Sequence, residues 1–326
     1  MDTINDQIEK LDMEASMTEI EYRVTESIIY HYTSPSGLQG IVNHQGKTKL
    51  WFTQYNCLND ISERKDLMDF VHGLCDFNVK EQKISPEFCS FVKDIKLDDE
   101  ILVTEKGPLY NGLETSSLSY EDSDTYLCCF SKHDDLLAMW NYYSKSSHYE
   151  GYSIGFWRHK FPVDFDKGYR LYVCNVIYEN NKKVGILNKY LLPLSQLFDK
   201  ADLEQRARIA SIIKQLFDQL QFLFKNNHFY HEQEIRAILR IPRKYRQTGI
   251  MVDKDQGQEI SQRLYRICNG IFVPYVEFYL PKQCVSSIKI APLLERDLAT
   301  ENLKDMLKFL DHPGVIIQSS DIPIRF

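Results

Sequence analysis

Short apolar runs bounded by turn-forming residues recur along this 326-residue chain and predict a series of β-strands. Polar or helix-patterned stretches separate the runs, and no internal repeat is visible. Strands and helices that follow one another irregularly predict an α+β fold. The predicted strands cover residues 28–30, 49–53, 126–130, 152–156, 170–177, 232–241, 271–280 and 287–290.

Apolar positions spaced about 3.6 residues apart predict the helices. The clearest helix covers residues 201–225, and a second begins where Ser34 caps a turn at Pro35. Weaker patterns predict three more helices, at 59–77, 136–143 and 293–310. The long helix places these residues on one face: Ile209, Ile213, Leu216, Phe217, Leu220 and Phe224.

The pattern predicts one folded domain over residues 28–326, preceded by an acidic arm or helix at 1–27. Residues 80–122 are polar and poorly periodic, which indicates an insertion of loops and short helices. No Pro- or Gly-rich linker divides the chain after residue 28, so we expect a single α+β domain.

Charge narrows the class of function. The net charge is −7, and residues 1–26 hold eight acids and two bases, a balance of −6 that leaves about −1 for the rest. A nearly neutral body has no general attraction for nucleic acid.

No apolar run approaches the roughly 18 residues of a membrane span, and the N-terminus is not a signal peptide. The eight cysteines lack C-x-x-C spacing, so we expect reduced thiols, no metal site and a cytoplasmic protein.

A carboxylate pair is the first candidate for chemistry. Glu232, Glu234 and Arg236 lie two residues apart, so on one strand they share a face. The same alternation is typical of any half-exposed strand. A zinc-protease motif is excluded because a second histidine is missing. Glycosidase chemistry is disfavoured because two strand neighbours do not flank a sugar.

A histidine on an apolar strand is the second candidate. In the run from Tyr30 to Thr33, His31 precedes a Ser-Pro-Ser-Gly turn. Strand ends that lead into helices are common places for ligand contacts. A lone histidine on a core strand is more often a structural group, so both interpretations stay open.

Aromatic residues at 140–143 are the third candidate. Trp140, Tyr142 and Tyr143 lie on a predicted helix that is unusually polar, with Asn141 among them. Aromatic residues at this spacing usually belong to a core. The alternative is that they hold a flat cationic ring such as nicotinamide.

Five cations follow the carboxylate pair within eleven residues. They form either a solvated edge or a rim that binds phosphate or a macromolecular target. Neither a G-x-G-x-x-G nor a complete G-x-x-x-x-G-K-[ST] loop is present, which argues against a Rossmann or P-loop cradle. The five are Arg236, Arg240, Arg243, Lys244 and Arg246.

These segments together resemble the bacterial family described as domain of unknown function 2971, over most of residues 28–295. The resemblance includes the three candidates above and further short motifs. These are Leu50 to Thr53, Leu58 to Asp60 with Glu63, Cys129 to Ser131, Gly151 to Phe156, Tyr275 to Phe278 and Ile288 to Pro292. That family in turn resembles the ADP-ribosyltransferase fold, which implies a split β-sheet core.

The resemblance implies that the protein cleaves NAD as an ADP-ribosyltransferase or NAD glycohydrolase, in a bacterial toxin or antiphage setting. Glu234 is similar to the glutamate that holds the nicotinamide ribose, with Glu232 directing the acceptor or water. Trp140 or Tyr143 would contact nicotinamide. The long spacing from His31 to Trp140 and the missing Ser-Thr-Ser element depart from the family pattern. The residues expected to hold NAD are His31, Tyr32, Thr33 and Arg236.

Two other functions remain open from the sequence. One is a sensor or adaptor whose cleft binds a nucleotide or a partner without turnover. The other is a nucleic-acid-binding defence protein that uses the cations between Arg236 and Arg246.

Overall fold

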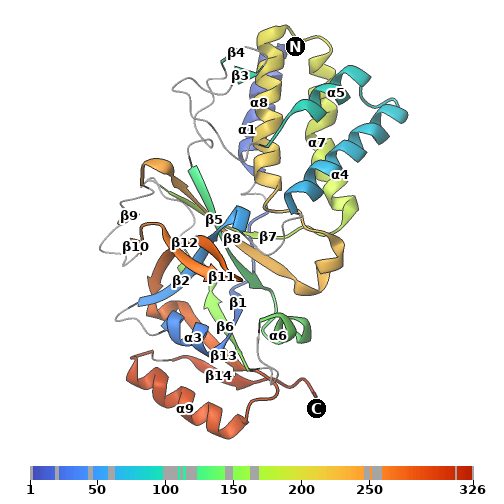
Figure 1. Ribbon diagram of the computed structural model, residues 1–326. Coiled ribbons are helices and arrows are strands. Elements are labelled where there is room, and N and C mark those ends of the chain that lie inside the picture. The colour runs from blue at the N-terminus through green and yellow to red at the C-terminus, as the bar shows by residue number, and fades with distance from the viewer. Residues whose placement is uncertain are drawn as a thin grey trace. The chain divides into compact units, whose positions relative to one another are not determined.

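The computed structural model describes most of the chain as helices and strands of an α+β protein (Figure 1). It describes residues 3–18, 22–42, 47–57, 63–97, 109–110, 113–114, 123–143, 150–161, 169–245, 250–251, 259–312 and 314–324. The described chain divides into two compact units, whereas the sequence predicted a single domain preceded by an acidic arm or helix. The first comprises residues 1–23, 59–123 and 176–229, and the second comprises 24–58, 124–175 and 230–326.

The first unit is helical. Helix α1 (Ile4–Ser16) packs against α7 (Asn180–Phe198) and α8 (Leu203–Leu220), while α4 (Glu63–Lys80) packs against α5 (Pro86–Asp94). Ile8, Leu11 and Ala15 of α1 are buried, because they form the apolar face of an amphipathic helix. The acidic N-terminal segment is therefore an integral helix of this unit. Two short strands, β3 (Leu109–Tyr110) and β4 (Leu113–Glu114), pair with each other.

The second unit is built on a large, mainly antiparallel sheet. Its order is β14-β13-β6-β1-β5-β2-β12-β10-β9, with β8 beside β5 and β7, and with β11 beside β12. The central strands are β1 (Ile28–Thr33), β2 (Lys47–Gln54), β5 (Ser123–Ser131), β6 (Tyr152–Trp157), β7 (Arg170–Asn175) and β8 (Glu234–Pro242). The others are β9 (Ile250–Met251), β10 (Glu259–Ile260), β11 (Leu264–Cys268), β12 (Ile271–Pro281), β13 (Val285–Ile290) and β14 (Ile316–Ser319).

The sheet branches at β5. Tyr30 of β1 is opposite Ser131 at the end of β5, whereas Thr53 and Gln54 of β2 are opposite Leu127 and Tyr126. Strand β8 also pairs with β5 and continues to β7. Because β5 has these three neighbours, its C-terminal end brings β1 close to the beginning of β8.

Two hydrophobic clusters lie on opposite faces of the central strands. The larger cluster contains Ile29, Phe130 and Ile235 from the sheet, and α3 (Pro35–Val42) and α9 (Arg296–Phe309) cover it. We refer to this side as the α3 face. The smaller cluster contains Tyr32 with Met139 and Trp140 of α6 (Leu137–Tyr143), and we refer to that side as the α6 face. Alternate residues of each strand therefore enter different clusters.

Most predicted elements are present, with informative differences. The helix predicted at 201–225 ends at Leu220, and the strand predicted from Glu232 begins at Glu234. Helix α7 was missed because Gly185 and Pro193 interrupt its pattern. Strand β11 was also missed, although Asn269-Gly270 before β12 is a strong hairpin signal. No helix in the described ranges is both long and apolar enough to cross a lipid bilayer.

Candidate functional site

The chain changes conformation sharply just before the carboxylate pair. Glu232 is the last residue of the 3₁₀ turn η3 (Asn227–Glu232), and Gln233 has a φ of 46°. This left-handed residue turns the chain, so β8 begins at Glu234. The prediction that Glu232, Glu234 and Arg236 share one strand face is therefore wrong for Glu232, which precedes the strand.

Glu234 and Arg236 form a buried, two-point ion pair. Arg236 Nε lies 2.9 Å from Glu234 Oε1, and Arg236 Nη2 lies 3.2 Å from Oε2. The Glu234 side chain is 6% exposed and that of Arg236 is 2% exposed. The pair is possible because residues two apart on a strand share a face. The planar guanidinium fixes the orientation of the carboxylate, and removal of either partner would leave a buried charge.

The turn after β5 connects the three segments that the sequence singled out. Ser131 Oγ donates to the Glu232 carbonyl at 2.9 Å, and Lys132 N donates to the Gln233 carbonyl at 3.0 Å. These bonds fix the start of β8 to the end of β5, next to Tyr30 of β1. The beginning of β8 therefore lies beside the segment from Tyr30 to Thr33.

Helix α6 reaches the same place through its exposed aromatic residues. Tyr142 Oη lies 3.0 Å from His231 Nε2, and the two rings are 5.8 Å apart. Tyr142 and Tyr143 are 50% and 37% exposed. This aromatic group lies beside the turn that carries Glu232, and it leaves ring surface open to solvent.

Trp140, by contrast, is a core residue. It is 1% exposed, and its ring lies edge-on to Tyr32 with a centroid distance of 4.7 Å. Its Nε1 donates to Asp135 Oδ1 at 2.8 Å. Since the ring is enclosed by protein, Trp140 presents no face to a ligand, and Tyr143 is the exposed residue of the two that we named for nicotinamide.

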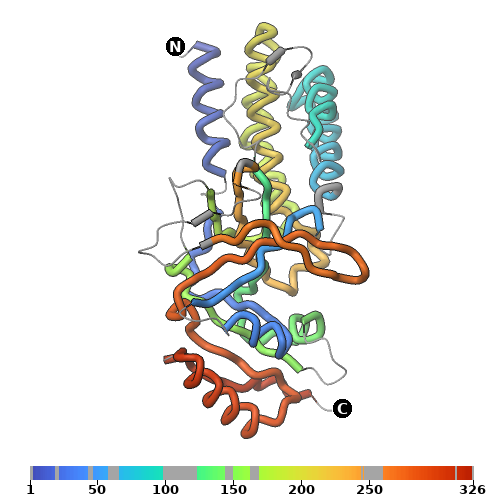
Figure 2. The backbone as a smooth tube through the Cα atoms, turned by 60° about the vertical axis from the view of Figure 1, so that its left-hand side comes forward, coloured from blue at the N-terminus to red at the C-terminus, as the bar shows by residue number. Residues whose placement is uncertain are grey.

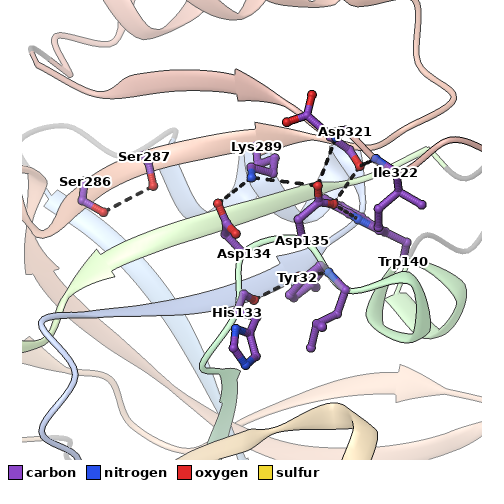
Figure 3. A network of polar contacts seen from close by, with 12 residues as sticks. Tyr32, His133, Asp134, Asp135, Trp140, Ser286, Ser287, Lys289, Asp321 and Ile322 are labelled. Atoms are coloured by element: carbon purple, nitrogen blue, oxygen red, sulfur yellow. Dashed lines mark hydrogen bonds and ion pairs between the residues drawn. The ribbon is translucent and has the colours of Figure 1, made fainter.

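A polar network holds the loop between β5 and α6 (Figure 3). Tyr32 Oη donates to the His133 carbonyl at 3.0 Å and accepts from Leu136 N at 2.9 Å. Asp135 also accepts from Ser320 Oγ at 2.7 Å. Burial is the main reason that the pKa of Tyr32 is raised. Tyr32 is thus a structural anchor for the loop.

An ion pair from β13 completes this network. Lys289 Nζ lies 2.6 Å from Asp134 Oδ2 and 3.9 Å from Asp135 Oδ2. The two aspartates were not among the candidates from the sequence, and Lys289 entered only as part of the motif from Ile288 to Pro292. Nothing local in the sequence indicates that these residues form an ion pair.

His31 has a fixed tautomer. Its Nδ1 lies 2.9 Å from the Cys129 carbonyl, which only accepts, so Nδ1 carries the proton and Nε2 is the acceptor. Burial lowers the pKa of His31 below its ordinary value of 6.5, and the bond to Cys129 opposes this only in part. The ring is therefore neutral at pH 7 and links β1 to β5.

The candidates are divided between two faces of the sheet. His31 shares its face with Ile29 and lies 5.6 Å from the Phe130 ring, which places it on the α3 face. Thr33 is on that face too, because a Cβ at Gly37 of α3 would overlap Thr33 Oγ1. Trp140 packs on Tyr32 on the α6 face, and Glu234 alternates with Ile235, which is on the α3 face. Glu234 and Trp140 therefore share the α6 face, and His31 and Thr33 lie on the other.

The cations after Glu234 do not form one exposed rim. Arg236 and Arg240 are 1% and 3% exposed, and Arg243 Nε lies 3.6 Å from Asp124 Oδ1. The side chain of Lys244 and all of Arg246 lie outside the described residues. Within the described ranges, no group of three or more His, Cys, Asp or Glu side chains is arranged to hold a metal ion.

Comparison with known sequences supports part of the resemblance. Residues 139–237, which are 99 of the 326 residues, match the family described as a protein of unknown function (DUF2971). The match runs from α6 to β8, so it includes Trp140, Tyr143 and the Glu234–Arg236 pair. No curated protein and no solved structure shows a significant match to the chain.

Proposed function

We propose that this protein binds NAD and cleaves its nicotinamide–ribose bond, as an ADP-ribosyltransferase or an NAD glycohydrolase. In this proposal the sheet that branches at β5 is the split core of that fold. The observation that carries the proposal is the pair of hydrogen bonds from Ser131 and Lys132 to Glu232 and Gln233. They bring the carboxylate segment to the end of β5, which is paired with the strand that carries His31. The Tyr142–His231 contact brings the helix that carries Tyr143 beside the same turn.

Cleavage of the nicotinamide–ribose bond requires few catalytic groups. The bond from ribose C1′ to the nicotinamide nitrogen breaks, its electron pair returns to the ring, and nicotinamide leaves as a neutral molecule. Positive charge develops on the ribose, and water or an acceptor hydroxyl, amine or carboxylate then bonds to C1′. A fixed carboxylate in water-poor surroundings stabilises such charge, and that is the role we assign to Glu234. Where the attacking group is water, a hydroxyl or an amine, Glu232 takes the proton that this group loses; a carboxylate acceptor loses none.

The arrangement refines the other roles. Tyr143, with its exposed ring, contacts nicotinamide, and Trp140 supports α6 from within the core. His31 and Thr33 lie on the α3 face and act as positioning residues, since His31 fixes β1 to the Cys129 carbonyl. Arg236 acts as a positioning residue, because its buried two-point ion pair orients the Glu234 carboxylate. Protein or nucleic acid remains the acceptor class, approached through the segment from Arg240 to Arg246.

The test is nicotinamide release from NAD by the purified full chain, with and without cell lysate as a source of acceptors. We expect Glu234→Gln to lower release at least ~100-fold, because one charged transition-state contact is lost. Glu277→Gln is the matched control, since Glu277 is also ion-paired, at 2.8 Å from Lys49, but lies on β12. Thermal unfolding of both variants must show that they are folded. Equal release by wild type and Glu234→Gln would refute the assignment.

A second candidate function is nucleotide binding without turnover. It is favoured by the contacts of Glu234, because both carboxylate oxygens already accept from Arg236 and the side chain is buried. It predicts that NAD raises the unfolding temperature while no nicotinamide is released. At 100 times its Kd a ligand stabilises the folded state by about 2.7 kcal/mol, which is easily measured.

A nucleic-acid-binding function has less support. Burial of Arg236 and Arg240 removes two of the five cations on which it depended. It predicts binding to nucleic acid that weakens steeply as the salt concentration rises. The logarithm of the binding constant should fall with the logarithm of the salt concentration, with a slope of roughly one per phosphate contact. Binding that ignores salt, or none, would exclude it.

A further inference from the structure

The segment that follows β14, residues 320–324, runs beside helix α6 (Figure 2). Ser320 N donates to the Ile290 carbonyl at 2.9 Å, which fixes the start of the segment to β13. Ile322 then packs against the small cluster that contains Trp140 of α6. We refer to residues 320–324 as the C-terminal segment, and these contacts bring it against α6.

One carboxylate joins the C-terminal segment to α6. Asp135 Oδ1 accepts from Trp140 Nε1 at 2.8 Å and from Ser320 Oγ at 2.7 Å. Its Oδ2 accepts from Asp321 N at 3.1 Å, and Lys289 Nζ of β13 lies 3.9 Å away (Figure 3). Both oxygens are occupied, so a single side chain holds α6, β13 and the C-terminal segment together.

These contacts require the carboxylate of Asp135. An ionised carboxylate only accepts hydrogen bonds, and it can accept several at once. Bonds to an ionised acceptor are shorter and stronger than bonds to a neutral one. The Asp135 side chain is 15% exposed, and Lys289 supplies positive charge beside it. An asparagine at this position would turn an amide donor toward groups that already donate, so it could keep only part of the arrangement.

Helix α6 depends on such contacts because it is short. It has seven residues, too few to be stable without tertiary packing. Trp140, which is 1% exposed, anchors it in the protein. Tyr142 and Tyr143 follow on its exposed side, and Tyr142 Oη lies 3.0 Å from His231 Nε2. The position of Trp140 therefore determines where the exposed tyrosines lie beside the turn that carries Glu232.

We propose that Asp135 is a positioning residue through which the C-terminal segment sets the place of α6, and with it the place of Tyr143 beside the turn that carries Glu232. The contacts run from the C-terminal segment to Asp135 and from Asp135 to Trp140. The role of Tyr143 rests on the proposed cleavage of NAD. The coupling of the C-terminal segment to α6 does not, so the two can fail separately.

The first test is amide hydrogen exchange of the full chain, measured over residues 136–143. Ser320→Ala removes one donor to Asp135 and leaves α6 itself unchanged. We expect exchange in α6 to become at least ~10-fold faster, the effect of losing one bond to an ionised acceptor. The matched control is Ser286→Ala, because Ser286 is a buried serine of β13 whose hydroxyl contacts Ser287 instead. Unchanged exchange in Ser320→Ala, or an equal rise in the control, would overturn the proposal.

The second test separates positioning from a general loss of stability. In the nicotinamide-release assay, we expect Asp135→Ala to raise the KM for NAD at least ~5-fold and to change kcat less than about twofold, because binding weakens while Glu234 stays in place. Asp135→Asn keeps one acceptor oxygen and should recover part of the KM, and Ser286→Ala should change neither constant. An unchanged KM in Asp135→Ala would overturn the link to Tyr143. A wild type that releases no nicotinamide would refute the cleavage of NAD, and exchange in α6 would still decide the coupling.

Discussion

Strand β8 and the β11–β12 hairpin differ in which of their alternating residues are buried and which are exposed to solvent. In β8, charged and apolar residues alternate, yet Glu234 to Ile241 are all buried, with Arg236 1% exposed. In the hairpin, polar and apolar residues also alternate, yet the exposed positions are Tyr265, Ile267 and Phe272. Charges lie inside in one region, and apolar rings lie outside in the other.

The difference teaches what alternation means in this fold. A period of two places side chains on two faces of a strand, and each face then meets whatever the remaining chain supplies. The charged face of β8 is enclosed, so its charged side chains need partners inside the protein. Glu234 and Arg236 provide these by pairing with each other. The apolar face of the hairpin has no element of this chain against it in the described ranges.

The largest effect is expected from breaking the charge pair inside β8. Arg236→Met leaves the Glu234 carboxylate buried without its two-point partner, and we expect a loss of about 3–5 kcal/mol in the free energy of unfolding. Urea denaturation measures this directly. Glu234→Leu combined with Arg236→Met removes both charges and should recover most of the loss. A change below about 1 kcal/mol for Arg236→Met would show that the pair is solvated.

A smaller loss of stability is expected from removing the hydroxyl of Tyr32 on β1. This hydroxyl, like the charged groups of Glu234 and Arg236 on β8, is a polar group that points into the protein. Tyr32→Phe leaves Leu136 N and the His133 carbonyl without their partner. Loss of such part-buried bonds costs about 1–3 kcal/mol. The measurement is thermal unfolding beside Tyr265→Phe, an exposed tyrosine that should change little. Equal effects would remove the distinction between inward and outward hydroxyls.

A pH-dependent effect of similar or smaller size is expected from His31. Burial lowers the pKa of His31 in the folded state, so below about pH 6.5 the unfolded chain takes up a proton that the folded chain does not. Stability is therefore complete above that pH and falls as pH decreases, by at most about 1.4 kcal/mol per pH unit for one proton. His31→Asn keeps a donor for Cys129 and should flatten this slope.

A second buried histidine contributes to that slope in both proteins. His312, whose pKa is also lowered mainly by burial, contributes in the same direction and is present in both proteins. A slope that does not change in His31→Asn would mean that His31 is hydrated in the folded state.

The smallest effect is expected at the hairpin. Ile267→Thr keeps a β-branched residue on β11 and changes only a side chain that is 71% exposed. The free energy of unfolding should change by no more than about 0.5 kcal/mol. A loss near 2 kcal/mol would show that an element of the same chain covers this face, and would end the contrast with β8.

Local signals were sufficient for much of the secondary structure. The apolar period predicted α8, and the Ser34-Pro35 sequence predicted the start of α3, where Gly37 N donates to Ser34 Oγ. These features depend on residues within one turn of each other. Strand β8 was predicted, but its start was placed two residues early because the positive φ of Gln233 has no signature in the side chains around it.

The sequence indicated which segments contain the candidate residues, but it did not indicate how those residues are arranged in space. Ser131 and Lys132 join Glu232 and Gln233 across about 100 residues of chain, a contact that the sequence alone does not indicate. The division of His31 and Trp140 between two faces was not foreseen. It follows from the neighbours of β1, with α3 on one side and α6 on the other.

The sequence by itself determined where strands and helices lie, because hydrogen-bond geometry and side-chain period act over a few residues. It also determined which side chains of a strand share a face, as for Glu234 and Arg236. Only the tertiary structure decided which faces are enclosed, because enclosure depends on segments far away in the chain. For that reason Arg236 lies inside the protein, Trp140 supports the core, and Phe272 faces the solvent.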